Sequence, residues 1–267
     1  DLLIKGHGTI LNINQLSDNG YSSGFFNNIP DDSGIIRSVP LVIKYDDMLY
    51  PSLALEIIRV VTGEKKIYVD YGDIGVESVS VGKYKIPTDM FGRALVNFRG
   101  KEKTFKYISA VDILNNNFKA EDIDGKIVLI GTSAAGLLDL RATPFESVFP
   151  GAEVHANLID NVLVGDFISK PSWADGANIV HIFVIVILSI FVLAYLPILL
   201  VPFILALIIA LDWYFLYTMF FDEGVVLSIL MPVLSIVSSA LVVILINNFY
   251  IERSEEHTSE LQSRITI

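Results

Sequence analysis

VPLVIKYDDMLYPSLALEIIRVVTG, residues Val39 to Gly63, is the stretch that decides the fold class. Its β-branched and aromatic residues predict a strand from Val39 to Tyr45, which a turn at Asp46 and Asp47 ends. Pro51 is favoured in the first turn of a helix, and Gly63 is a common helix stop, so a helix is predicted between them. A strand that leads so soon into a helix is typical of an α/β fold.

The sequence on the C-terminal side continues this mixture. Short alternating strands are predicted between residues 67 and 100, with turns at 71–73, 82–83 and 89–92. KYISAVDILNN predicts a short helix, and KIVLIGTSAAG predicts a buried strand, Ile127 to Ile130, that ends in a turn of small residues. GAEVHANLIDNVLVG predicts an amphipathic helix with one apolar face, formed by Val154, Leu158, Ile159, Val162 and Leu163. We therefore expect a mixed sheet with flanking helices over residues 1–177.

Composition divides the chain into a water-soluble part and a membrane part. The chain is 52% hydrophobic, which is high for a soluble domain of 267 residues. Residues 1–177 carry 17 Lys and Arg against 23 Asp and Glu, a net charge of −6 that disfavours nucleic acid as a partner. The chain has no cysteine, which excludes thiol catalysis and zinc–thiolate sites.

Residues 178–250 are almost continuously apolar and predict three transmembrane helices, at about 178–196, 198–219 and 225–246. Pro197 and Pro202 lie where the first long run would fold back, and the FFDEG segment supplies a polar loop before the third helix. Asp212 lies near the end of the second helix. Two interpretations remain for it: a carboxylate that snorkels to the membrane interface, which we favour, or a functional intramembrane group.

The two ends of the sequence differ from what we expect of the natural protein. The chain starts with a strand-like segment at Asp1, and we expect the natural protein to begin earlier. RSEEHTSELQS, Arg253 to Ser263, resembles the in-frame translation of a sequencing-library adapter. We therefore expect residues 253–267 to be an artefact and give them no function, including His257.

One group of residues invites a catalytic interpretation. Gly131, Ser133 and Ala135 nearly match the G-x-S-x-G elbow of hydrolases, and Asp139 and His155 follow in the order of a catalytic triad. The final glycine is missing, and the three candidates lie unusually close in sequence, so we favour a structural strand-to-helix turn. We assign no catalytic residue, no metal site and no cofactor.

Several phrases resemble one family, the type-two CHASE domain, an extracellular sensor of bacterial cyclases and histidine kinases. They occur in family order: GFFNNIPDDSGIIRSVPL (24–41), YPSLALEIIR (50–59), KIPTDMFGRALVNFRG (85–100), ISAVDIL (108–114), GKIVLIGTSAAGLLDLRATP (125–144) and PGAEVHANLIDNVL (150–163). The resemblance extends over about residues 1–250. It implies a membrane helix and a first sheet strand before Asp1, and three closing membrane helices.

The resemblance also suggests site residues. Candidates for ligand binding or signalling are Asp31, Arg37, Ser133, Asp139, Arg141 and His155; candidates for holding the fold are Pro30, Gly34, Gly131, Thr143, Pro144, Gly151 and Ala156. Arg37 and Asp139 are expected either to form a buried ion pair, which we favour because lone buried charges are costly, or to contact an anionic ligand.

The expected function is that of a signalling receptor. Residues 1–177 would sense an unidentified extracytoplasmic ligand, and the helices, in the inner (plasma) membrane lipid bilayer, would lead to a cytoplasmic C-terminus. The resemblance implies an adenylate or guanylate cyclase as output, with a histidine or serine/threonine kinase as the alternative. A homodimer is expected, and the small residues Ser235, Ser238, Ser239 and Ala240 would let helices approach closely. Two other classes stay open: a membrane-anchored serine hydrolase that uses Ser133, and a structural membrane protein without output.

Overall fold

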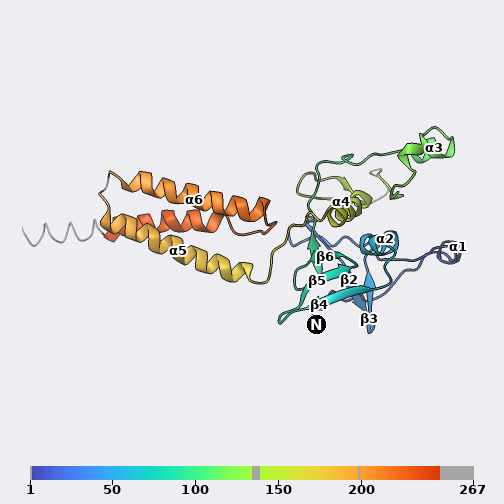
Figure 1. Ribbon diagram of the computed structural model, residues 1–267, viewed down its shortest axis with the longest axis horizontal. Helices are drawn as coiled ribbons and strands as arrows, with labels where there is room; N and C mark the ends of the chain where they lie inside the picture. The colour runs from blue at the N-terminus through green and yellow to red at the C-terminus, as the bar shows by residue number, and fades with distance from the viewer. Residues whose placement is uncertain (1, 134–138, 198, 247–267) are drawn as a thin grey trace, which may run out of the picture. The chain divides into compact units, whose positions relative to one another are not determined.

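The computed structural model describes residues 2–133, 139–197 and 199–246. The chain divides into two compact units, Asp1–Ser172 and Trp173–Ile267. The first unit mixes strands and helices, and the second is mainly helical (Figure 1). The residues predicted to be an artefact, 253–267, lie outside the described residues.

The stretch that decides the fold class forms three short strands and a helix, and the strand predicted from Val39 to Tyr45 is divided at Leu41 into two. β1 (Ser38–Pro40) is followed by β2 (Val42–Tyr45) and β3 (Met48–Pro51), which pair antiparallel around a turn where Asp46 has a positive φ of 49°. α2 (Leu53–Val61) begins after Ser52, whose hydroxyl accepts a hydrogen bond from the Leu55 amide at 3.3 Å. The predicted helix is confirmed, and the strand β3 before it was not predicted.

A three-stranded meander follows. β4 (Ile67–Tyr71), β5 (Val76–Val81) and β6 (Tyr84–Pro87) pair antiparallel, and β7 (Arg93–Leu95) pairs with β1. The turn before β7 is fixed by the Asp89 carboxylate, which accepts hydrogen bonds from the amides of Phe91 and Arg93, each at 2.9 Å. The three predicted turns of this region are all confirmed.

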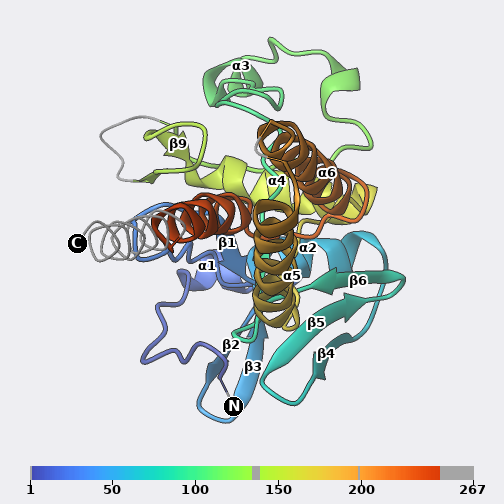
Figure 2. The ribbon, with the colours of Figure 1, turned by 90° about the vertical axis from the view of Figure 1, so that its left-hand side faces the viewer.

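The core of the unit lies between α2, the meander and α4 (Gly151–Val164), and α2 and α4 pack against each other (Figure 2). Leu55, Val79 and Leu158 are almost completely buried. The apolar face predicted for α4 is confirmed except at Leu163, which is 37% exposed because it lies toward the edge of that face.

The sheet architecture differs from the expected single mixed sheet. Among the described residues, the paired strands form four small antiparallel sheets, and parallel pairing is limited to the isolated bridges Lys5 with Lys44 and Phe25 with Ser52. The mixed α/β character is confirmed, whereas the continuous sheet was wrong. The strands have only two to six residues each, too few to extend one ladder across the unit.

The buried strand predicted for Ile127 to Ile130 is also wrong. Ile127 and Leu129 pack against the core, but Val128 is 55% and Ile130 99% exposed, and the segment has no ladder partner among the described residues. An apolar run predicts a strand covered on both faces, whereas this segment is covered on one.

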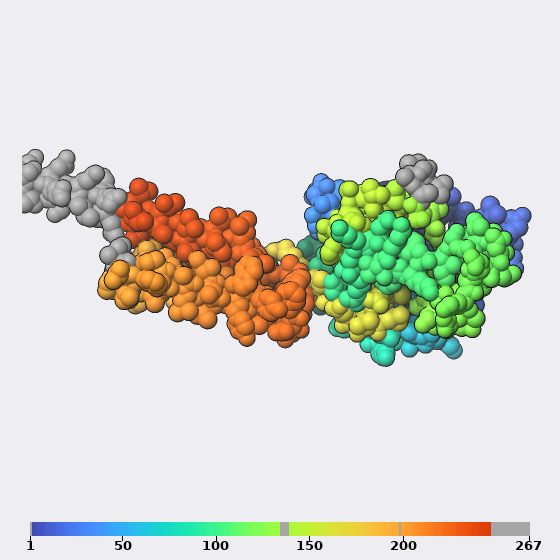
Figure 3. All heavy atoms as spheres, turned by 90° about the horizontal axis from the view of Figure 1, so that it is seen from above, coloured from blue at the N-terminus to red at the C-terminus, as the bar shows by residue number. Residues whose placement is uncertain are grey.

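The remaining elements of the unit are short: α1 (Asn14–Ser17), α3 (Ala110–Leu114), the 3₁₀ turn η1 (Ala120–Asp122), β8 (Leu140–Arg141) and β9 (Phe149–Pro150). α3 confirms the predicted short helix. The segment around it lies on the surface of the unit (green in Figure 3). β8 and β9 pair antiparallel immediately before α4 and so help to position its first turn.

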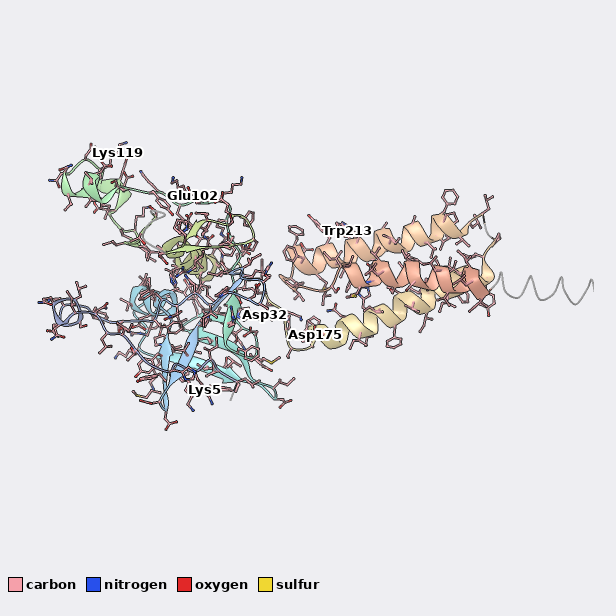
Figure 4. All side chains as sticks on the ribbon, turned by 180° about the vertical axis from the view of Figure 1, so that it is seen from behind. Lys5, Asp32, Glu102, Lys119, Asp175 and Trp213 are labelled. Carbon is pink, nitrogen blue, oxygen red and sulfur yellow. The ribbon has the colours of Figure 1, made fainter. Side chains whose placement is uncertain are left out.

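The second unit contains α5 (Ala174–Tyr195), α6 (Val201–Phe221) and a helix at Leu230–Ile246, which lie side by side (orange to red in Figures 1 and 2). α5 and α6 are long and apolar enough to cross a membrane, and the helix Leu230–Ile246 is shorter. This last helix begins later than the predicted residue 225, because Val225 still bonds back to Met219 at the end of α6, at 2.8 Å. Trp213 is exposed on α6 (Figure 4).

The favoured interpretation of Asp212 as a snorkelling carboxylate is wrong. Its side chain is 3% exposed, and Oδ1 lies 2.6 Å from Nε2 of His181 on α5. The position of Asp212 near the end of its own helix suggested the interface, but α5 places an imidazole opposite it. Asp212 therefore belongs to the interior of the helical unit.

Candidate functional site

The Asp31 loop is a turn closed by its own side chains. Oδ1 of Asp31 accepts hydrogen bonds from the Ser33 hydroxyl at 2.5 Å and from the amides of Ser33 and Ile35 at 2.9 and 3.2 Å. Oδ2 pairs with Arg37, and Gly34 has the positive φ, 78°, that the turn requires. The Ser33 hydroxyl, with the backbone amides and Arg37, lowers the pKa of Asp31 to about 2. Pro30 precedes the loop and is exposed.

The buried ion pair expected between Arg37 and Asp139 does not form. The turn at Gly34 folds Arg37 back onto Asp31, and both side chains of that pair are partly exposed. Asp139 instead faces Arg141, with 3.4 Å between Oδ1 and Nη2. Each observed pair closes a much shorter loop of chain than a pair between Arg37 and Asp139 would close. Each therefore costs less conformational entropy, which explains both pairings.

Two glycines let chain segments approach the first turn of α4. The Gly151 amide donates to the carbonyl of Asp139 at 2.9 Å, and a Cβ on Gly151 would lie 2.5 Å from the Asp139 carboxylate. A Cβ on Gly131 would lie 2.3 Å from that of Ala152. These close approaches explain why glycine is needed at both positions, and they place a carboxylate at the N-terminus of a helix, where the helix dipole favours it.

A tight turn connects β8 and β9. Thr143 is buried, and its amide and hydroxyl donate to the carbonyl of Glu146 at 2.8 and 3.2 Å. Pro144 lies exposed within the turn, while Ala156 is half-buried on α4. Thr143 and Pro144 therefore lie in the turn that leads the chain through β9 into α4.

His155 is a buried titratable group on α4. It is 6% exposed, and Nε2 lies 3.3 Å from the carbonyl oxygen of Phe26, while Nδ1 has no hydrogen-bond partner among the described residues. Burial lowers the pKa of His155, and the Phe26 carbonyl and the negative charge of Asp139 oppose this only in part. The imidazole is therefore mainly neutral at pH 7.

The residues of the catalytic interpretation are not assembled into a triad. Asp139 and His155 lie close enough to interact electrostatically. Ser133 is exposed and, within the described ranges, makes no hydrogen bond to His155, and Ala135 lies outside the described residues. A serine nucleophile requires a base within hydrogen-bond reach. In addition, the described part of the chain shows no group of three or more His, Asp or Glu residues that could hold a metal ion.

Sequence reasoning missed a polar network on α4 that binds the segment after β7. Asn161 accepts a hydrogen bond from the Asn97 amide and donates one to its carbonyl, each at 2.9 Å, and Asn157 accepts from the Arg99 amide at 2.8 Å. The Arg99 side chain pairs with Asp160 at 2.7 Å and with Asp166. Side chains of α4 thus make the hydrogen bonds to the backbone of this segment that a neighbouring strand would otherwise make.

Glu153 extends the same network toward the N-terminus of α4. It is buried and accepts hydrogen bonds from the amides of Lys103 and Thr104 at 3.0 and 3.1 Å, and from the Tyr107 hydroxyl at 2.6 Å. Burial, together with the hydrogen bond to Glu153, raises the pKa of Tyr107. The sequence contains a usable signal: Glu153, Asn157 and Asn161 are spaced by four, so they share one helix face.

The described part of the chain combines an α/β unit with two helices that are long and apolar enough to cross a membrane. A family model described as CHASE2 domain matches residues 8–194, and the chain belongs to this family. CHASE2 is an extracellular sensory domain of signalling receptors. No curated protein and no solved structure matches the chain.

Proposed function

We propose that the chain is the sensing and membrane-spanning part of a bacterial receptor that signals to a cytoplasmic enzyme. The observation that carries this proposal is the extent of the family match, which runs from the α/β unit through most of α5. Sensor and first apolar helix are thus parts of one family unit. A conformational change in such a sensor has a direct covalent route to the membrane.

The proposed location is the plasma (inner) membrane, with three passes. α5 has 22 residues, which rise about 33 Å, close to the roughly 30 Å of a bilayer core. α6 returns, and the helix Leu230–Ile246 makes the third pass, so that the sensor lies outside and the C-terminus inside. Lipid is therefore the proposed environment of the many exposed apolar side chains of these helices.

The proposed output is an adenylate or guanylate cyclase, with a histidine or serine/threonine kinase as the alternative. Cyclases work at a dimer interface, so a homodimer is part of the proposal. The ligand candidates remain the six residues named from the resemblance. The hydrolase alternative receives no support, because Ser133 and His155 do not meet. An uninterrupted cyclase or kinase reading frame after Glu252 in the native locus would support a receptor; a stop codon there would favour a protein without its own output.

Topology gives a direct test, because the chain has no cysteine of its own. Single cysteines replace Ser23, Glu223 and Leu199, all exposed residues, in the full chain expressed in bacterial cells. A membrane-impermeant thiol reagent should label Ser23→Cys and Glu223→Cys in intact cells, and Leu199→Cys only after permeabilisation. Labelling of all three in intact cells, or of none, contradicts the proposed passes.

A further inference from the structure

Among the described residues of the second unit, three polar contacts join α5 to other elements. Asn178 accepts a hydrogen bond from the Ser228 amide at 3.0 Å, just before the helix Leu230–Ile246. The hydroxyls of Ser189 and Ser239 lie 2.7 Å apart, and both residues are buried. His181 lies between these two contacts along α5 and faces Asp212 on α6. The helix that follows the sensor is thus the one that holds the other two.

The contact between His181 and Asp212 is the only one of the three that involves ionisable groups in the described part of the unit. Nε2 of His181 lies 2.6 Å from Oδ1 of Asp212, and the two side chains are 17% and 3% exposed. The distance is that of an ion pair, but the angles are not those of a hydrogen bond, and Nδ1 of His181 has no partner among the described residues. The ring of Phe215, one turn after Asp212, packs edge-on against the imidazole at 5.6 Å.

The neighbouring helix adds no charge to the pair. Residues 230–246, the helix packed beside them, contain no ionisable side chain. Asp175 at the start of α5 is exposed, as are Asp222 and Glu223 in the loop after α6. A carboxylate in an apolar bundle is stable only with a partner, so α6 keeps its place against α5 as long as this pair is intact.

We propose that the His181–Asp212 pair is a latch that couples α6 to α5, so that a displacement of α5 by the sensor moves both helices together. This inference rests on the proposed function and adds a residue-level coupling element to it. The position of the pair relative to the sensor does not by itself make it a coupling element. The pair couples α5 and α6 only if breaking the contact weakens the association of these two helices.

Stability of the full chain in detergent tests the contact itself. His181→Leu and Asp212→Leu each leave one polar group buried without its partner, so each should lower the unfolding temperature. His181→Leu with Asp212→Leu removes both groups, and the exchange His181→Asp with Asp212→His restores a pair; both double variants should recover the unfolding temperature. Thr218→Val is the control, because the Thr218 hydroxyl bonds only the Phe215 carbonyl of its own helix. Single variants as stable as the control would overturn the latch.

Signalling tests the coupling without any ligand. Residues 1–252 are fused to a soluble cyclase catalytic domain, and the basal cyclic nucleotide level is measured in cells that hold equal amounts of each fusion. Gly151→Val disturbs the sensor, because its side chain would overlap the Asp139 carboxylate. With the latch intact, this substitution should change the basal level severalfold. In the Asp212→Leu background, where the contact is broken and His181 is left buried without its partner, it should change nothing, and in the exchanged pair its effect should return.

The outcomes separate the two proposals. An equal effect of Gly151→Val with and without the latch overturns the inference and leaves the proposed function in place. No effect of Gly151→Val even with the latch intact shows that the first unit does not control the fused output. In that case the proposed function fails, and the latch loses its role in signalling whatever its effect on stability.

Discussion

At the scale of one residue, the buried His155 makes the free energy of unfolding of the sensor depend on pH. Because its pKa in the folded state is lowered from 6.5, the unfolded chain binds more protons than the folded chain between the lowered value and 6.5. Stability should therefore fall as the pH decreases below about 6.5, by at most about 1.4 kcal/mol per pH unit. Thermal unfolding of the full chain in detergent at pH 7.5 and 5.5 measures this loss.

The chain offers a matched control in its exposed His7. His155→Gln should remove most of the difference between the two pH values, whereas His7→Gln should leave it unchanged. A pH dependence that survives His155→Gln would assign it to other groups.

Glu153 is the second residue with a specific expectation. Glu153→Gln replaces a charged acceptor by an amide, and the amides of Lys103 and Thr104 then lose part of their hydrogen bonding. We expect a loss of about 1–3 kcal/mol of unfolding free energy, measured by chemical denaturation. Glu121→Gln should cost little, because Glu121 pairs with Lys119 at the surface. Equal effects of the two substitutions would argue against the network.

Helix α4 provides a comparison at the scale of one element. Leu158→Ala, at a fully buried position, should cost about 2–5 kcal/mol. Leu163→Ala, the same change on the same helix at a position 37% exposed, should cost clearly less. Chemical denaturation of both variants measures the difference, and equal costs would mean that Leu163 is buried in solution, as its periodicity predicted.

Elements set by local sequence could be predicted, and contacts between distant elements could not. α2, α3, α4 and the turns of the meander follow from periodicity, capping residues and turn residues, all of which act within a few positions. The pairing of Arg37 with Asp31 depends on how the turn at Gly34 folds, and the contact of His181 with Asp212 depends on the packing of two helices. His181 was not among the predicted site residues, although an imidazole within a long apolar helix is a signal by itself.

At the scale of the whole molecule, the serines proposed for a dimer do not share one role. Ser239 is buried against Ser189 within the chain, whereas Ser238 is exposed. Ser239→Leu should therefore lower the unfolding temperature of the chain, and Ser238→Leu should leave it unchanged. If the exposed face is the dimer contact, Ser238→Leu should reduce the cross-linked dimer fraction in membranes. An unchanged dimer fraction would exclude that face.

The binding of residues 97–107 by side chains of α4 has a consequence for how this protein tolerates change. Asn157, Asn161 and Glu153 bond to the main chain of the segment and, apart from Tyr107, not to its side chains. Exposed positions of the segment, such as Thr104, can therefore vary in sequence, because every residue except proline supplies the same amide. Phe98 and Arg99 are constrained in addition, by burial in the core and by the ion pairs with Asp160 and Asp166. Substitutions at such exposed positions as Thr104 would leave the hydrogen bonds from α4 in place, so the surface of this segment can change on a constant scaffold.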